Sequence, residues 1–205
     1  KYNLQRLMKN SEIIFTKRKG LIPIDGDFFL KDIISLDQFN RKSVEKVFST
    51  AAKIKKTSSK ELLKILQGKI VGLLFFEPST RTFSSNSAAV KRLGGQTVEH
   101  QNPMQTSSVV KGETIEDTIK IMEQYSDAIV IRHPLIGTAK RSAEVADIPI
   151  INAGDGAGEH PTQALLDSFT IYEKFGTLEN LTGLFCGDFK YGRALRSLLK
   201  LFSMY

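Results

Sequence analysis

The sequence is poor in the residues that build disulfide-rich, metal-binding and base-stacking proteins. Cys186 is its single cysteine, and its 205 residues include no tryptophan. One cysteine cannot close a disulfide within the chain, and none of the usual Cys/His spacings of a metal site occurs. We therefore expect no metal, and we interpret Cys186 as a small buried residue of an apolar strand rather than as a nucleophile.

Long apolar runs are absent as well. No stretch approaches the roughly 20 apolar residues that cross a bilayer. The N-terminus also lacks the basic, apolar and small-residue regions of a signal peptide. We expect a soluble chain without a membrane partner and, by default, a cytoplasmic location; an organellar targeting segment preceding Lys1 would change that expectation.

What the chain has in excess is positive charge, in an otherwise ordinary globular composition. It is 41% hydrophobic and 25% charged, with a net charge of +7. The basic residues are scattered, apart from a cluster at 17–19, and no RNA- or DNA-binding signature accompanies them. We expect no nucleic-acid partner, and the charge suits small anionic substrates.

Segments with strand and helix patterns alternate along the chain. Strands are predicted at 69–76, 97–100, 128–132, 148–152 and 181–187, of which 69–76 and 181–187 are apolar runs. Helical patterns lie at 35–55, 81–93, 113–125, 137–146, 160–175 and 193–204, the first with Ser35 or Asp37 as its N-cap. This alternation predicts an α/β fold whose parallel sheet is flanked by helices.

A domain boundary is predicted at Gly176, where a long helix ends and a new strand–helix unit begins. Residues 1–31 form an N-terminal extension or linker in this interpretation. Residues 32–176 form one α/β domain, and residues 177–205 begin a second, similar α/β domain that stays incomplete.

Polar residues follow the predicted strands, at the sheet edge where open α/β folds bind ligands. After 69–76 come Ser79, Thr80, Arg81 and Thr82, at the start of a helix. Free backbone N–H groups, hydroxyls and a guanidinium there suit a phosphate. An ordinary helix cap followed by a surface arginine would give the same local pattern.

Three more strand ends carry polar side chains. Arg132 ends one strand, Arg193 follows another, and His160 and Gln163 share one face of a helix start. Glu159 stands where a dinucleotide-binding loop would have its third glycine, and no P-loop lysine follows. These residues predict a site for a small phosphate-bearing anion, with no organic cofactor.

Seven motifs occur together and in order. They are Phe-Glu-Pro-Ser-Thr-Arg-Thr (76–82), Arg-Leu-Gly-Gly (92–95), Ser-Ser-x-x-Lys-Gly-Glu (107–113), Arg-His-Pro (132–134), Asn-Ala-Gly-Asp-Gly (152–156), His-Pro-Thr-Gln-x-Leu-Leu-Asp (160–167) and Gly-Asp-x-Lys-Tyr-Gly-Arg (187–193). The series closely resembles that of aspartate carbamoyltransferase catalytic chains, within the aspartate/ornithine carbamoyltransferase superfamily.

The resemblance implies transfer of a carbamoyl group from carbamoyl phosphate to L-aspartate, giving N-carbamoyl-L-aspartate and phosphate in de novo pyrimidine biosynthesis. Residues 32–176 would be the carbamoyl-phosphate-binding domain, and 177–205 the beginning of the aspartate-binding domain. The family occurs as homotrimers with shared active sites, sometimes with regulatory chains or fused pyrimidine-pathway domains, so these are the partners it implies.

The resemblance also implies roles for residues. The phosphate would be held by Ser79, Thr80, Arg81 and Thr82. Arg132 would bridge the phosphate and the carbonyl oxygen, and His160 and Gln163 would face the carbamoyl group, with His160 donating to the carbonyl oxygen. Arg193 matches a ligand of an aspartate carboxylate. Ser107 and Lys111 match a loop that enters the neighbouring subunit's site, where Lys111 also contacts aspartate. Arg81, Arg132, His160 and Lys111 would be the catalytic residues.

Three features depart from the family pattern. The sequence ends at Tyr205, after the first strand and helix of the second domain, so we expect little or no turnover from this chain alone. Asn86 stands where phenylalanine is usual, and Ala194 and Arg196 stand where threonine and histidine are usual. A carbamoyltransferase for another amine, such as ornithine, and a non-catalytic anion-binding or assembly module stay open as alternatives.

Overall fold

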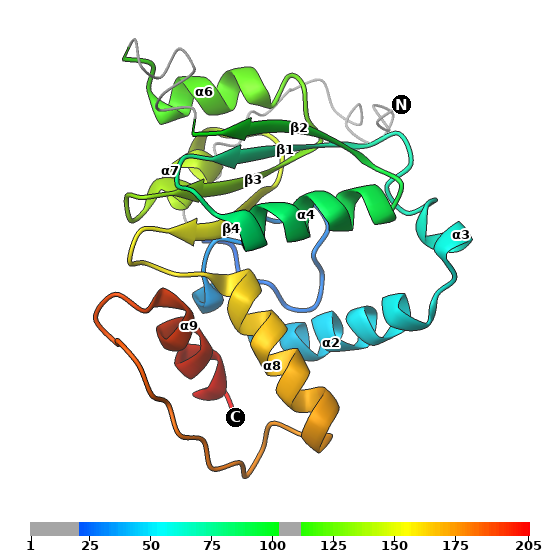
Figure 1. The fold of residues 1–205 in the computed structure, drawn as a ribbon, viewed down its shortest axis with the longest axis vertical. Coiled ribbons are helices and arrows are strands. Elements are labelled where there is room, and N and C mark those ends of the chain that lie inside the picture. Colours follow the sequence, from blue (N-terminus) through cyan, green and yellow to red (C-terminus); the bar gives the residue numbers. More distant parts are fainter. Residues whose placement is uncertain (1–20, 103–111) are drawn as a thin grey trace, which may run out of the picture.

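A four-stranded parallel sheet forms the centre of the molecule (Figure 1). The computed structural model describes residues 21–102 and 112–205. The strands lie in the order β2-β1-β3-β4, and their bounds are Ile70–Phe75 for β1, Gln96–Gln101 for β2, Ala128–His133 for β3 and Ile150–Asp155 for β4. The predicted α/β class with a parallel sheet is confirmed.

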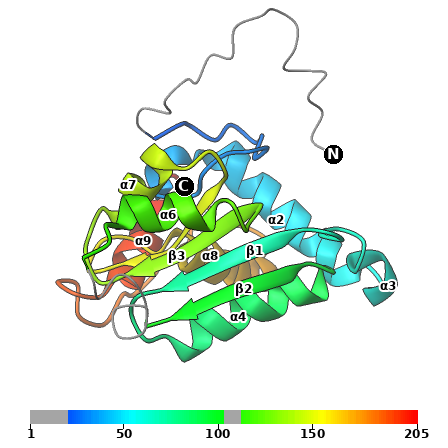
Figure 2. The ribbon, with the colours of Figure 1, turned by 90° about the horizontal axis from the view of Figure 1, so that it is seen from above.

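Helices cover both faces of this sheet (Figure 2). One face carries α6 (Ile115–Met122) and α7 (Thr138–Val145), and the other carries α4 (Thr80–Arg92) and α8 (Pro161–Phe175). Helix α2 (Arg41–Lys56) packs against α8 through buried apolar residues. This layering puts the starts of α4 and α8 at the same edge, where β1 and β4 end.

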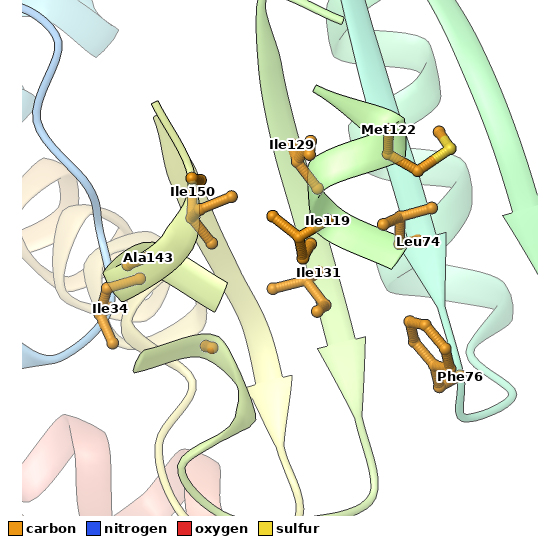
Figure 3. Close-up of a cluster of buried hydrophobic side chains, with 11 residues drawn as sticks. Ile34, Leu74, Phe76, Ile119, Met122, Ile129, Ile131, Ala143 and Ile150 are labelled. Carbon is orange, nitrogen blue, oxygen red and sulfur yellow. The ribbon is translucent and has the colours of Figure 1, made fainter. Parts of the chain in front are cut away.

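The core is built from the apolar runs that predicted the strands. Every residue of β1 except Ile70 is buried. Figure 3 shows Ile129 and Ile131 of β3 pointing toward Ile119 of α6, with Leu74 of β1 beside them. Each buried side chain of this size stabilises the fold by about 1.5–3 kcal/mol, so the sheet is a rigid base for the loops at its edge.

The segment before α2 differs from its prediction as a single helix with Ser35 or Asp37 at its cap. Ser35 instead caps a short 3-10 helix, η1 (Leu36–Gln38), and Phe39 then returns to extended backbone. Asn40 is the N-cap of α2, because its side chain accepts a hydrogen bond from the Ser43 N–H. A short helix, α3 (Ser59–Leu62), follows α2 and was not predicted.

The predicted strand at 181–187 is wrong. These residues form no strand, and Leu184 is 96% exposed. Cys186 is exposed too, so its interpretation as a buried strand residue is also wrong. A strand needs a neighbour for its backbone hydrogen bonds, and all the strands of the described chain belong to the one sheet formed by β1 to β4.

Helix α9 (Arg193–Phe202) agrees with its prediction and packs back onto the molecule. Leu201 is fully buried in the cluster that joins α2 and α8. This packing places the N-terminus of α9 near the edge where the other polar turns meet. Across residues 21–102 and 112–205, no helix is long and apolar enough to span a bilayer.

Candidate functional site

A pocket of about 1010 Å³ opens at the carboxyl edge of the sheet. Its walls come from the starts of α4, α8 and α9 and from the end of β3. The structure brings together there all the predicted site residues that it describes: Ser79, Thr80, Arg81, Thr82, Arg132, His160, Gln163 and Arg193. Ser107 and Lys111 lie outside the described residues, so their predicted roles stay predictions.

The first wall is the N-terminus of α4. Ser79 is its N-cap residue in extended backbone, and among the described atoms its side chain makes no capping hydrogen bond. The first N–H groups of a helix have no partner within the helix, and they carry partial positive charge. With the hydroxyls of Thr80 and Thr82 and the guanidinium of Arg81, this wall presents donors to an oxyanion.

The second wall holds two arginines around one carboxylate. An Nη of Arg132 lies 2.9 Å from Glu77 Oε1, and an Nη of Arg193 lies 3.4 Å from Glu77 Oε2. The side chains of both arginines are nearly buried, at 12% and 13% exposure. Burial and the charge of Arg193 lower the pKa of Arg132, and Glu77 acts against this shift.

Glu77 is a site residue that the sequence analysis missed. It lies in the loop between β1 and α4, directly before Pro78, and it joins Arg132 on β3 to Arg193 on α9. Its position shows that a carboxylate fits between the two guanidinium groups. An acidic residue inside a motif of hydroxyls and an arginine that suits an anion was the signal that could have identified it.

His160 forms the third wall, at the N-cap of α8 with Pro161 as the first helical residue. The imidazole is almost fully buried, and its Nδ1 lies 3.2 Å from the Thr162 hydroxyl. Burial, with the nearby charges of Arg193 and Arg132, lowers the pKa of His160 to about 4, although Glu77 acts in the opposite direction. The ring is therefore neutral at pH 7 and suited to donate a hydrogen bond without carrying charge.

Gln163 and Asn86 line the outer part of the pocket. The Gln163 amide donates to Asp167 Oδ1 at 2.9 Å, one turn along α8. The Asn86 amide donates to the Thr82 carbonyl at 2.8 Å, so this side chain is turned along α4. Phe83 makes an apolar contact for α4, because its ring meets buried Phe75 edge-on at 5.2 Å.

The other two departures from the family pattern, Ala194 and Arg196, lie in different places relative to the pocket. Ala194 is part of the lining, whereas Arg196 points toward the loop before α8, where an Nη donates to the Gly158 carbonyl at 3.4 Å.

Within residues 21–102 and 112–205, no group of three or more His, Cys, Asp or Glu side chains is placed to hold a metal ion. The donors in the pocket are cationic or neutral, which suits anions.

Comparison with known proteins agrees with this geometry. The family model described as "Aspartate/ornithine carbamoyltransferase, carbamoyl-P binding domain" matches residues 31–173. The aspartate carbamoyltransferase catalytic subunit of Methanobrevibacter smithii is 48% identical over 179 residues, which are 87% of this chain and 56% of that protein. The multifunctional protein pyr1-3 of Dictyostelium discoideum is 49% identical over 185 residues, 88% of this chain but 8% of that protein.

Solved structures lead to the same family. Aspartate transcarbamoylase of Trypanosoma cruzi, in complex with carbamoyl aspartate and phosphate, superposes with a TM-score of 0.82 at 44% identity, covering 90% of this chain and 59% of that one. Another structure of that enzyme holds carbamoyl phosphate and aspartate. This chain thus spans little more than half the length of the single-function relatives it matches, and it belongs to the aspartate/ornithine carbamoyltransferase family.

Proposed function

We propose that the pocket binds carbamoyl phosphate and that the chain serves transfer of its carbamoyl group to L-aspartate, a step of pyrimidine biosynthesis. The observation that carries this proposal is the convergence of the α4 N-terminus, Arg81, Arg132 and neutral His160 in one pocket. Aspartate transcarbamoylase structures with carbamoyl phosphate and aspartate, from a relative 44% identical to this chain, support the choice of substrates.

The phosphate group would lie against the start of α4. Its oxygens would accept hydrogen bonds from the free backbone N–H groups and from the hydroxyls of Thr80 and Thr82. Arg81 would add a charged, two-pronged donor. Arg132 would lie between phosphate and carbonyl oxygen, because it reaches the pocket from the end of the neighbouring strand β3.

The carbonyl oxygen would meet His160 and Arg132. When the Thr162 hydroxyl donates to Nδ1 of His160, the proton of the neutral ring is on Nε2, which can donate to that oxygen. Negative charge grows on this oxygen as the amine attacks. Donors fixed in place before the reaction stabilise such a charge, and one of them is typically worth about 3–4 kcal/mol of transition-state energy.

The transfer itself needs no protein nucleophile. The neutral amine of aspartate forms a bond to the carbamoyl carbon, the bond from that carbon to the phosphate oxygen breaks, and phosphate leaves with the electron pair. The leaving phosphate can accept the proton that the amine loses. The protein contributes proximity between two anions that repel each other in water, an effect worth up to about 7–11 kcal/mol in favourable cases.

The aspartate side would use Arg193 of the second wall and groups from a neighbouring subunit. Arg193 would bind an aspartate carboxylate, and its contact with Glu77 shows that its guanidinium can pair with a carboxylate. Ser107 and Lys111 would come from a neighbouring subunit of a homotrimer. We also propose a cytoplasmic location and a domain boundary near Gly176. Fusion to other pyrimidine-pathway domains is a further part of the proposal, and the existence of a multifunctional relative supports it.

Calorimetric titration of this chain with carbamoyl phosphate tests the proposal. We expect saturable binding to one site, weakened by about 30-fold or more in Arg81→Ala, because truncating one partner of a charged contact costs about 2–5 kcal/mol. Arg92→Ala is the matched control, since Arg92 is an exposed arginine in the last turn of the same helix. No binding to the unaltered chain, or equal binding to Arg81→Ala, would contradict the proposal.

A further inference from the structure

One face of α9 lies along the loop that ends at His160. Arg193, Arg196, Ser197 and Lys200 are spaced three, four and seven residues from the first, so they lie along one side of the helix. The loop in question is 156–160, between β4 and α8. These four side chains contact four of its five residues.

The contacts involve both the backbone and the side chains of the loop. Arg193 donates to the Gly156 carbonyl, and Arg196 donates to the Gly158 carbonyl at 3.4 Å. The backbone N–H of His160 donates to the Ser197 hydroxyl at 3.0 Å. The imidazole is therefore attached to a backbone that α9 holds from one side.

Lys200 completes the series with an ion pair. Its Nζ lies 2.8 Å from Glu159 Oε1 and 2.7 Å from Asp37 Oδ2. Burial lowers the pKa of Lys200, but the hydrogen bonds to Asp37 and Glu159 outweigh burial, so the pKa is raised and the ammonium stays charged. Its side chain is 34% exposed, which leaves the pair partly screened by solvent.

Glu159 is held from the opposite side as well. Its Oε1 accepts from the Ser35 hydroxyl at 2.7 Å, and its Oε2 accepts from the Leu36 N–H at 2.9 Å. The residue next to His160 thus joins η1, the loop and α9. Its backbone N–H also donates to buried Asp155 at 2.9 Å.

We propose that the Glu159–Lys200 pair is a positioning device for His160, through which α9 keeps the imidazole in its buried place beside the pocket. The proposal rests on the proposed function for its catalytic meaning. Lys200 contacts Glu159, the residue before His160, and would act on the imidazole only through it. Lys200 is therefore a positioning residue. With the pair broken, the Glu159 side chain keeps only its contacts to η1, and we expect water to gain access to the ring.

The test is an NMR titration of the histidine ring protons in the absence of ligand. The chain has three histidines, His100, His133 and His160, so the signal of His160 is assigned by its loss in His160→Gln. The charges that act on this ring are Arg193 from α9, Arg132 from β3 and Glu77 from the loop after β1. In Lys200→Met and in Glu159→Gln we expect the pKa of His160 to rise from about 4 toward 6.5.

The two variants separate positioning from a direct effect of charge. Removing the positive charge of Lys200 would raise the pKa of His160 through space, whereas removing the negative charge of Glu159 would lower it. A rise in both variants therefore supports positioning. No change, shifts in opposite directions, or loss of the folded circular-dichroism spectrum in both variants would overturn the proposal.

Two controls complete the design. Lys200→Arg keeps the ion pair and should keep the low pKa of His160. Lys55→Met breaks a comparable pair, Lys55–Glu173 at 2.6 Å between α2 and α8, and should leave His160 unchanged. The titration needs no substrate, so absent carbamoyl-phosphate binding would count against the proposed function alone.

Discussion

Two apolar segments of similar sequence take different structures in this molecule. Residues 71–75 read Val-Gly-Leu-Leu-Phe, and residues 182–186 read Thr-Gly-Leu-Phe-Cys. The first is the buried strand β1, which pairs with β2 and β3. The second forms no strand, and its Leu184 is almost fully exposed. An apolar run of strand length therefore makes a strand possible, but the presence of a pairing partner decides whether it forms.

The same contrast divides the candidate site. Arg132 lies in β3, and Arg81 and His160 follow β1 and β4, so the packing of the sheet fixes their positions. Arg193 follows the unpaired segment and reaches the pocket because α9 packs on α8 through residues such as Leu201. The part of the pocket formed by Arg81, Arg132 and His160 is thus held by a strand network, and the part formed by Arg193 is held by one helix.

The contrast between the two segments is tested most strongly by shortening the leucine at the third position of each, Leu73 and Leu184. Leu73→Ala removes a side chain with no exposed surface and should lower the free energy of unfolding by about 2–5 kcal/mol. Leu184→Ala should change it by less than about 0.5 kcal/mol, because that side chain packs on little. Urea unfolding measures both. Similar losses in the two variants would contradict the structure.

The pH dependence of stability sharpens the comparison, because His160, whose pKa is lowered to about 4, lies on the sheet side. His160 has a pKa of about 4 in the folded chain against 6.5 ordinarily, so the unfolded chain binds more protons. Its contribution is complete above about pH 6.5 and is lost as the pH falls toward 4. Between about pH 7.5 and 5 we expect a loss on the order of 2 kcal/mol.

The measurement is urea unfolding at both pH values, with His160→Gln as the reference. Glutamine does not titrate, so this variant should lack that part of the pH dependence. An identical pH dependence in the two proteins would show that His160 is not held neutral in the folded chain.

The smallest effect concerns the reactivity of Cys186. Because this thiol is exposed in the folded chain, a thiol reagent such as Ellman's reagent should modify it within about one order of magnitude of the rate in denaturant. A cysteine inside a covered strand would react far more slowly. Strong protection of Cys186 without denaturant would restore the predicted strand.

The sequence was sufficient for the sheet and for most of the residues that line the pocket. Short strand segments alternating with helical ones predicted β1 to β4, and the polar residues at their ends predicted the walls of the pocket, since parallel strands end at one edge. The N-cap of α2 was missed because Ser35, Asp37 and Asn40 are all good capping residues, and tertiary contacts select among them. Ser35 is held by Glu159, which is distant in sequence.

The role of Glu77 could not be predicted from local patterns. Its carboxylate connects arginines that are 55 and 116 residues away in the chain. Such a contact depends on how β3 and α9 are placed, and periodicity carries no information about that placement. The same reason hid the alignment of α9 with the loop before His160.

A crystal structure of this chain with carbamoyl phosphate would test the central claim most directly. We expect the phosphate group to lie against the N–H groups and hydroxyls at the start of α4, within reach of Arg81, and the carbonyl oxygen to face His160 and Arg132. A ligand bound elsewhere, or one whose phosphate lies away from α4, would contradict it.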